Sequence, residues 1–206
     1  LSGVPSTLCP LLAIGHDDAA FELAEWGLSL SAEEPDAHHV HSYSRLALTR
    51  WLRDTARDAG RTALAIIAAS VAFEKSLSRE DYEAARELCS DEAWPNLRES
   101  LLARLMVADY APERIDILLD ENRIADAIAV TDREVSGHQS PHDTSLLRLA
   151  RSACHGDPDW TIGFALRLAN PIMTEGRSNH YDLAVEWLAV AAQAHAIAGR
   201  SGQWRE

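Results

Sequence analysis

The amino-acid sequence predicts an all-α fold, built as an irregular α-solenoid of about ten helices arranged in hairpins. Two observations lead to this prediction. Apolar residues recur at helical spacing through nearly the whole chain, whereas the period-two alternation of a half-buried strand is almost absent. A short pattern also recurs along the chain, in which an apolar helix end, a turn and an acidic helix start follow one another.

Ten segments carry the helical spacing, and Pro, Gly or polar turn residues separate them. In chain order they are 16–30, 41–60, 61–76, 78–89, 92–108, 112–121, 122–135, 141–154, 157–176 and 179–200. Segment 61–76 is apolar on nearly all of its sides, so we expect it in the middle of the stack. The short breaks fit helix–helix connections of a few residues.

Several segments begin or end with a recognisable helix signal. Acidic residues fill the first turn of 16–30, where the helix dipole favours them. Gly60 follows the second segment as a residue that tolerates a left-handed backbone. Ser78 and Asp81 stand three positions apart, which indicates a capping box with Asp in the place of Glu.

The repeated pattern links four helix pairs. Residues 11–25 align with residues 118–132, so that the turn at Gly15 matches the turn at Asn122, and looser copies cover 172–191 and 73–89. Gly and Asn are the residues that a left-handed turn favours. Small residues let neighbouring helices approach closely, and in the four copies they are Ala20, Ala84, Ala127 and Ala184. Stacked hairpins of this kind are tetratricopeptide-like.

Composition and charge limit the classes of partner. The chain has 206 residues and a net charge of −13, with Lys75 as its single lysine. We predict one helical-repeat domain over 1–206, with a weak subdivision near 60–77, and we expect it to be a piece of a longer chain. An acidic surface repels nucleic-acid phosphates, so we predict no direct nucleic-acid binding. The acid excess is typical of a halophile, and GC-rich codon usage is the alternative explanation.

Three features of the sequence indicate a cytoplasmic protein that does not contact a membrane. The apolar runs are too short to span a bilayer, and the first residues lack the basic start of a secretory signal. Cys9, Cys89 and Cys154 are far apart and odd in number, which fits neither a disulfide framework nor a paired zinc motif. We expect each cysteine to be a small buried residue in a reducing compartment.

Four elements between residues 70 and 206 stand in a characteristic order. They are a Tyr–x–x–Ala helix at Tyr82, a linker with Trp94, a second Tyr–x–x–Ala helix within 175–188, and a turn at 199–204 that leads to Trp204. This order resembles the C-terminal helical region of prokaryotic SWIM zinc-finger proteins. The CxC…CxH finger of that family is absent from this chain. The resemblance therefore implies a tetratricopeptide-like appendage and carries no zinc or nucleic-acid role onto any residue here.

Three histidines in the stretch PDAHHVHSY are the candidate metal ligands. At a helix start His38 and His41 would share a face and His39 would not, and the remaining ligands would come from Asp36, Glu34 or His16. We predict instead a solvated loop that leads into a helix. A pH-responsive contact is a third reading, because histidine titrates near neutrality.

The other histidines and the tryptophans are predicted to be structural. We expect His142 and Asp143 to form a helix cap rather than a catalytic pair, His155 to precede a turn, and His195 to pack along its helix. His138 and His180 have no catalytic motif around them. The tryptophans are expected to wedge between hairpins, with exposed anchors for a partner as the alternative, and they are Trp26, Trp51, Trp94, Trp160, Trp187 and Trp204.

Three hypotheses about function follow. The first is a non-enzymatic helical-repeat scaffold that binds a protein or peptide along a groove, or docks to other domains of its own longer chain. Its acidic surface with arginines favours basic or mixed-charge partners. The second is the structural arm of a SWIM zinc-finger, nucleic-acid-associated protein. The third is a metal-dependent enzyme that uses His38, His39 and His41. We favour the first, which has no catalytic, cofactor-binding or metal-binding residue.

Overall fold

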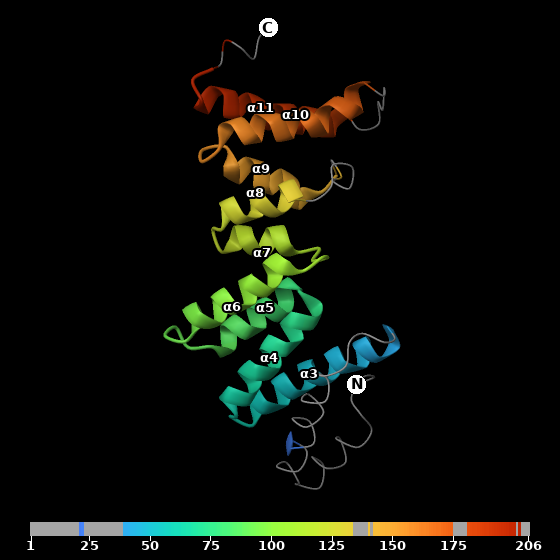
Figure 1. Ribbon diagram of the computed structural model, residues 1–206, viewed down its shortest axis with the longest axis vertical. Coiled ribbons are helices and arrows are strands. Elements are labelled where there is room, and N and C mark those ends of the chain that lie inside the picture. The colour runs from blue at the N-terminus through green and yellow to red at the C-terminus, as the bar shows by residue number, and fades with distance from the viewer. Residues whose placement is uncertain are drawn as a thin grey trace. The chain divides into compact units, whose positions relative to one another are not determined.

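The computed structural model describes residues 21–22, 39–133, 140, 142–174, 181–200 and 202, and these residues form helices and turns without a strand. Nine helices, labelled as in Figure 1, make up most of this part: α3 (His39–Asp58), α4 (Thr62–Ser76), α5 (Arg79–Leu88), α6 (Trp94–Val107), α7 (Arg114–Asp120), α8 (Ile124–Arg133), α9 (Thr144–Ala153), α10 (Pro158–Thr174) and α11 (Tyr181–Ile197). The predicted all-α class with packed helical hairpins is confirmed.

The chain divides into two compact units, Leu1–Pro112 and Glu113–Glu206. Helices α3 to α6 belong to the first unit, and helices α7 to α11 belong to the second. The weak subdivision that we expected near 60–77 falls on α4, inside the first unit.

Helix α4 is the central helix of the first unit, because α3, α5 and α6 all pack against it. Its buried residues are mostly small, and they are Ala65, Ala68, Ala69, Ala72 and Phe73. Small side chains let the neighbouring helices come close to α4. Within the first unit, this segment therefore has the middle position that we expected for it. Phe73 begins a row of ring contacts, since its ring lies 5.4 Å from that of Tyr82, which lies 5.4 Å from Trp94.

The second unit is built on two helix pairs with α9 between them. Helices α7 and α8 form a hairpin that packs against α9, and α10 and α11 pack against the same helix. The core of the α10–α11 pair is aromatic. Trp187 is completely buried, and its ring meets Phe164 edge-on at 5.9 Å. Phe164 in turn stacks on Trp160 at 4.6 Å.

The tryptophans that the structure describes pack within the helical stack. Trp94 and Trp187 are buried, as predicted. Trp51 and Trp160 are half-buried, and the Trp160 indole N–H donates a hydrogen bond to Asp132 at 3.0 Å. Trp26 and Trp204 lie outside the described residues.

The predicted buried state of the cysteines is confirmed for two of the three. Cys89 and Cys154 are free thiols in the core. The Cys154 Sγ donates a hydrogen bond to the Ala150 carbonyl oxygen at 3.3 Å. Burial raises the pKa of the Cys154 thiol, which keeps it protonated and unreactive. Cys9 lies outside the described residues.

Among the described residues, four in turns adopt a positive φ. Gly60 (72°) ends α3 and Asn122 (55°) separates α7 from α8, both as predicted, and Gly199 (71°) follows α11. The fourth is Leu77, with a φ of 51°. A leucine is strained in this conformation, so its residue type does not indicate a left-handed turn. Its side chain is buried, and its N–H donates to the Phe73 carbonyl oxygen at 2.7 Å, so packing and hydrogen bonding offset that strain.

Three of the four small residues of the repeated pattern lie among the described residues, and two of these three are buried. Ala127 and Ala184 are buried, as expected. On α5, however, the fully buried small residue is Ala85, whereas Ala84 is only half-buried. The prediction for Ala84 was therefore wrong by one position, because Ala85 is the residue that faces the core beside Tyr82. Ala20 lies outside the described residues.

Two glycine substitutions should change stability in opposite directions. An added Cβ would meet nothing within 4 Å at either Gly60 or Gly163, so the backbone alone decides. Gly60→Ala should lower the free energy of unfolding by about 1–2 kcal/mol, because alanine is strained at a φ of 72°. Gly163→Ala lies inside α10 and should raise it by about 0.5–1 kcal/mol. Urea denaturation of both variants would measure this, and a gain from Gly60→Ala would contradict it.

Candidate functional site

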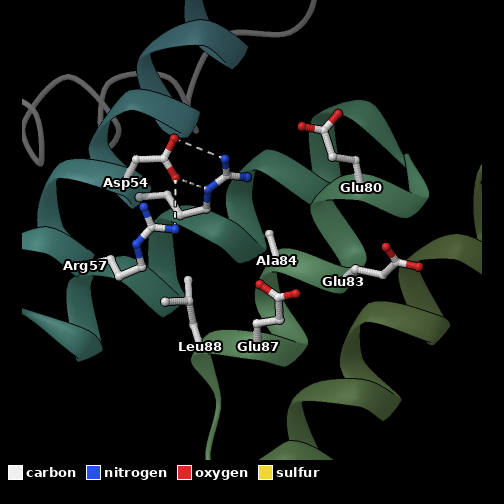
Figure 2. Close-up of a pocket in the computed structure, with 8 residues that line it drawn as sticks. Asp54, Arg57, Glu80, Glu83, Ala84, Glu87 and Leu88 are labelled. Carbon is white, nitrogen blue, oxygen red and sulfur yellow. Dashed lines mark hydrogen bonds and ion pairs between the residues drawn. The ribbon is translucent and has the colours of Figure 1, made fainter.

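A groove of about 380 Å³ lies between α3 and α5 in the first unit. Its lining residues are Arg53, Asp54 and Arg57 from α3, and Glu80, Glu83, Ala84, Glu87 and Leu88 from α5. Figure 2 shows Asp54 and Arg57 on the α3 side and Glu80 and Glu83 on the α5 side, with Ala84 between them. Charged side chains therefore form both walls, and two apolar side chains lie between the walls.

A buried carboxylate fixes the two walls to one another. Asp81 on α5 is completely buried, although it is an acidic residue. Arg50 on α3 donates two hydrogen bonds to it, from Nε at 3.0 Å and from Nη2 at 2.7 Å. Arg53 on the next turn of α3 donates from Nη1 at 3.1 Å. A bidentate arginine has a fixed geometry, so this cluster sets how α3 lies on α5.

Two serines complete the surroundings of Asp81. The Ser76 and Ser78 hydroxyls donate to its carboxylate at 2.6 and 3.1 Å. The Asp81 N–H donates back to the Ser78 Oγ at 3.3 Å, which confirms Ser78 as the predicted N-cap of α5. The other half of the predicted capping box is wrong. The Ser78 N–H donates to the Ser76 Oγ at 3.1 Å, because the Asp81 carboxylate points toward the arginines of α3.

The electrostatics of the cluster keep Asp81 ionised. Burial by itself raises the pKa of the Asp81 carboxyl, but hydrogen bonds from Arg50 and Ser76 outweigh burial and hold the pKa below its usual value. The hydrogen bond to Asp81 likewise raises the pKa of Arg50. The carboxylate and the guanidinium groups are therefore charged at neutral pH, and each lowers the free energy of the other's charged form.

The arginines of the groove are already engaged by acids of the same helix. Arg53 contacts Asp54 at 2.8 Å in addition to Asp81, and Arg57 contacts Asp58 at 3.1 Å. The glutamates of the opposite wall are less constrained. Glu80 lies 3.9 Å from Arg50 of α3, and Glu83 pairs with the exposed Arg79 of its own helix at 2.8 Å. The charge that the groove offers to a ligand is therefore mainly negative.

Three glutamates form a row along the α5 wall. Glu80, Glu83 and Glu87 occupy positions i, i+3 and i+7, which lie on one side of a helix and span about 10 Å at 1.5 Å per residue. All three are exposed. The lining residues of the groove carry carboxylates, guanidinium groups and aliphatic side chains, and none of them carries a thiol, hydroxyl or imidazole. The arrangement suits recognition of charged groups.

The candidate histidine site falls mostly outside the described residues. His38 is not among them, and neither are Glu34, Asp36 and His16. His39 and His41 lie in the first turn of α3, but their side chains are outside the described part. Among the side chains that the structure does describe, no group of three or more His, Cys, Asp or Glu residues could hold a metal ion. The metal-dependent enzyme therefore stays a prediction.

The predicted helix cap at His142 and Asp143 is confirmed. The Asp143 carboxylate accepts hydrogen bonds from the N–H groups of Ser145 at 2.9 Å and Leu146 at 3.4 Å, at the start of α9. His155 is exposed after α9, and His195 is half-buried on α11. His138 and His180 lie outside the described residues.

The groove and its buried cluster were not predicted from the sequence. Arg50 and Arg53 lie 31 and 28 positions before Asp81, and only the packing of α3, α4 and α5 brings them together. The glutamate row could have been found, because its helical spacing is visible in the sequence. Its position opposite α3 could not have been.

Comparison with protein-family models, with curated proteins and with solved structures finds no match. In the described part of the chain, no helix is both long and apolar enough to cross a membrane. The SWIM resemblance and the structural-arm hypothesis stay predictions.

Proposed function

We propose that the chain is a non-enzymatic helical-repeat scaffold, and that the groove between α3 and α5 receives cationic side chains of a protein or peptide partner. The observation that carries this proposal is the exposed row of Glu80, Glu83 and Glu87 along one wall. Such a row attracts lysine or arginine and repels acidic partners and phosphates.

The shape of the groove supports a peptide rather than a single ion. Its glutamates are spread along about two turns of helix, so several cations spaced along a chain fit better than one. Ala84 and Leu88 offer apolar contact to the methylene stems of lysine and arginine.

The buried cluster supports a preformed site. Arg50 and Arg53 hold α3 on α5 through Asp81, so the two walls are in place before a partner arrives. A preformed site lowers the entropy cost of binding. The buried free thiols of the core fit a reducing compartment, and we propose that the scaffold works in the cytoplasm.

Binding of short fluorescent peptides would test the proposal. Three peptides would share one neutral sequence and carry three arginines, three lysines or three glutamates. We expect the two basic peptides to bind, the acidic peptide not to bind, and 1 M salt to weaken binding, because the Debye length falls to about 3 Å. Glu83→Gln and Glu87→Gln should each weaken binding by up to about fivefold, since an exposed ion pair contributes about 0.2–1 kcal/mol.

Glu74→Gln is the matched control, because Glu74 is an exposed glutamate of α4 that does not line the groove. It removes the same charge from the same unit and should leave peptide affinity unchanged. Equal losses from Glu74→Gln and Glu87→Gln would show that only net charge matters, and the groove would then not be the site.

A further inference from the structure

Helix α11 of the second unit has two apolar sides. Its buried side packs on α9 and α10 and consists of Ala184, Trp187, Val190, Ala191 and Ala194. Its open side carries a second apolar stripe at positions i, i+4, i+7 and i+11, which are Tyr181, Val185, Leu188 and Ala192. Tyr181 is 45% exposed and Val185 is 63% exposed. We call these four residues the α11 stripe.

In the described part of the second unit, Tyr181 and Val185 of the α11 stripe are exposed, and Leu188 and Ala192 are half-buried. Helix α9 lies between the α7–α8 hairpin and the α10–α11 pair, so its two sides are both covered. The described helices of this unit that pack on α11 are α9 and α10 (Figure 1). The α11 stripe therefore has the apolar character of a face that packs on another helix.

Residues around the stripe indicate what shape of partner fits. Ala189 and Ala196 are small and exposed beside it, so the larger side chains of Val185 and Leu188 stand out as a ridge next to small residues. Ridges of one helix pack beside small residues of another, where the two helices can approach closely. An amphipathic helix that lies along α11 is therefore the element that matches this surface.

The border of the stripe indicates the charge of that partner. Asp182 and Glu186 lie four positions apart, so they form an acidic edge along one side of the stripe. Glu186 contacts Arg151 of α9 at 3.4 Å, and Asp182 is exposed. A partner helix with lysine or arginine on the facing edge would complement these carboxylates. A second copy of this chain fits less well, because a net charge of −13 opposes association of two copies.

From these observations we propose that the α11 stripe docks an amphipathic helix with an aliphatic stripe and a basic edge. The inference goes beyond the proposed function, since it concerns a different unit and does not depend on the groove between α3 and α5. The partner helix would thereby extend the helical stack of the second unit by one helix.

Designed helical peptides added to the full chain would test the proposal. One peptide carries leucines at i, i+4, i+7 and i+11 with arginines along one edge, and its twin carries glutamates in place of the arginines. Fluorescence anisotropy should show binding of the basic-edged peptide and at least tenfold weaker binding of the twin. Hydrogen exchange should show new protection in Tyr181–Ile197 when the basic-edged peptide is bound.

Two variants decide whether the α11 stripe is the site. Val185→Asp should weaken binding of the basic-edged peptide by about tenfold or more, because a carboxylate would be buried without a partner. Asp182→Lys should weaken binding of that peptide and strengthen binding of its twin. A general loss of folding cannot produce both changes. Ile67→Asp on α4 is the matched control, because Ile67 is 56% exposed in the first unit, and it should change neither affinity.

Other results would overturn the proposal. Equal binding of the two peptides, or equal losses from Val185→Asp and Ile67→Asp, would remove the specific role of the stripe. Sedimentation of the chain alone is expected to show a monomer. A dimer that Val185→Asp dissociates would show that a second copy covers the stripe, contrary to the proposal.

Discussion

Replacing Asp81 with alanine is expected to lower the free energy of unfolding of the first unit by about 3 kcal/mol. Asp81 is completely buried and accepts hydrogen bonds from Arg50 and Arg53. Removing one partner of a buried ion pair costs about 3–5 kcal/mol, because the other charge stays without compensation. We expect the lower end of that range, since the Arg50 side chain is one-third exposed and water can reach it.

Hydrogen exchange followed by mass spectrometry would locate the loss. Peptides from α3, α4 and α5 should exchange faster in Asp81→Ala, and peptides from the second unit should not change. Glu83→Ala is the control, because Glu83 lies on the same helix in an exposed pair with Arg79 that contributes only about 0.3–0.5 kcal/mol. Similar losses in the two variants would mean that the cluster around Asp81 contributes no more than a surface pair.

The same cluster should make the stability of the first unit sensitive to acid. The pKa of Asp81 is lower in the folded chain than in the unfolded chain, so its contribution is complete above about pH 4, the usual range of aspartate. The contribution disappears as the pH falls from there through the lowered folded pKa. Denaturation from pH 7 to pH 2 should therefore show a shallower acid dependence in Asp81→Asn than in the unchanged protein.

Replacing Trp187 with alanine is expected to lower the free energy of unfolding of the second unit by about 3–5 kcal/mol. Trp187 is completely buried between α10 and α11, and it holds Phe164 by an edge-on ring contact. Removal of a buried aromatic ring loses its transfer free energy and leaves a cavity that the helices cannot fully close. Trp187→Phe should lose less, because a ring can still meet Phe164.

Val185→Ala is the matched control for Trp187→Ala. Val185 lies two positions earlier on α11 and is 63% exposed, so its truncation should change stability by no more than about 0.5 kcal/mol. Faster exchange in Trp187→Ala should be confined to α9, α10 and α11. If α3, α4 and α5 were destabilised to the same extent, the two units would unfold as one, and separate unfolding would be contradicted.

The helices and several turns of this chain could be predicted because their signals are local. Helical spacing identifies each described segment, and Gly60 and Asn122 adopt the left-handed backbone that their residue types favour. Ser78 caps α5 because its side chain accepts a hydrogen bond from the N–H of Asp81, three positions further on. Leu77 could not be predicted, because leucine rarely adopts a positive φ, and no residue beside it indicates the burial that offsets the strain.

The candidate site could be predicted only in part, because it combines residues that are far apart in the sequence. The glutamate row follows from the helical period of α5 alone. Arg50 and Asp81 meet only after α3 and α5 have packed on α4, and nothing in the 30 residues between them indicates this contact. Asp81 also has two roles. Its backbone N–H donates to the capping Ser78, and its carboxylate accepts hydrogen bonds from two arginines.

The contact between Arg50 and Asp81 also determines the register of α3. The surface of α4 beneath it is mostly alanine, and such a uniform surface would accept α3 at more than one height. Sliding α3 by one turn would place Asp54 or Leu46 opposite Asp81 in the position of Arg50. The first would set two carboxylates together, and the second would leave Asp81 buried without a charge partner. The ionic contacts of Asp81 with α3 thereby favour the observed alignment over the alternatives that the alanine surface alone would allow.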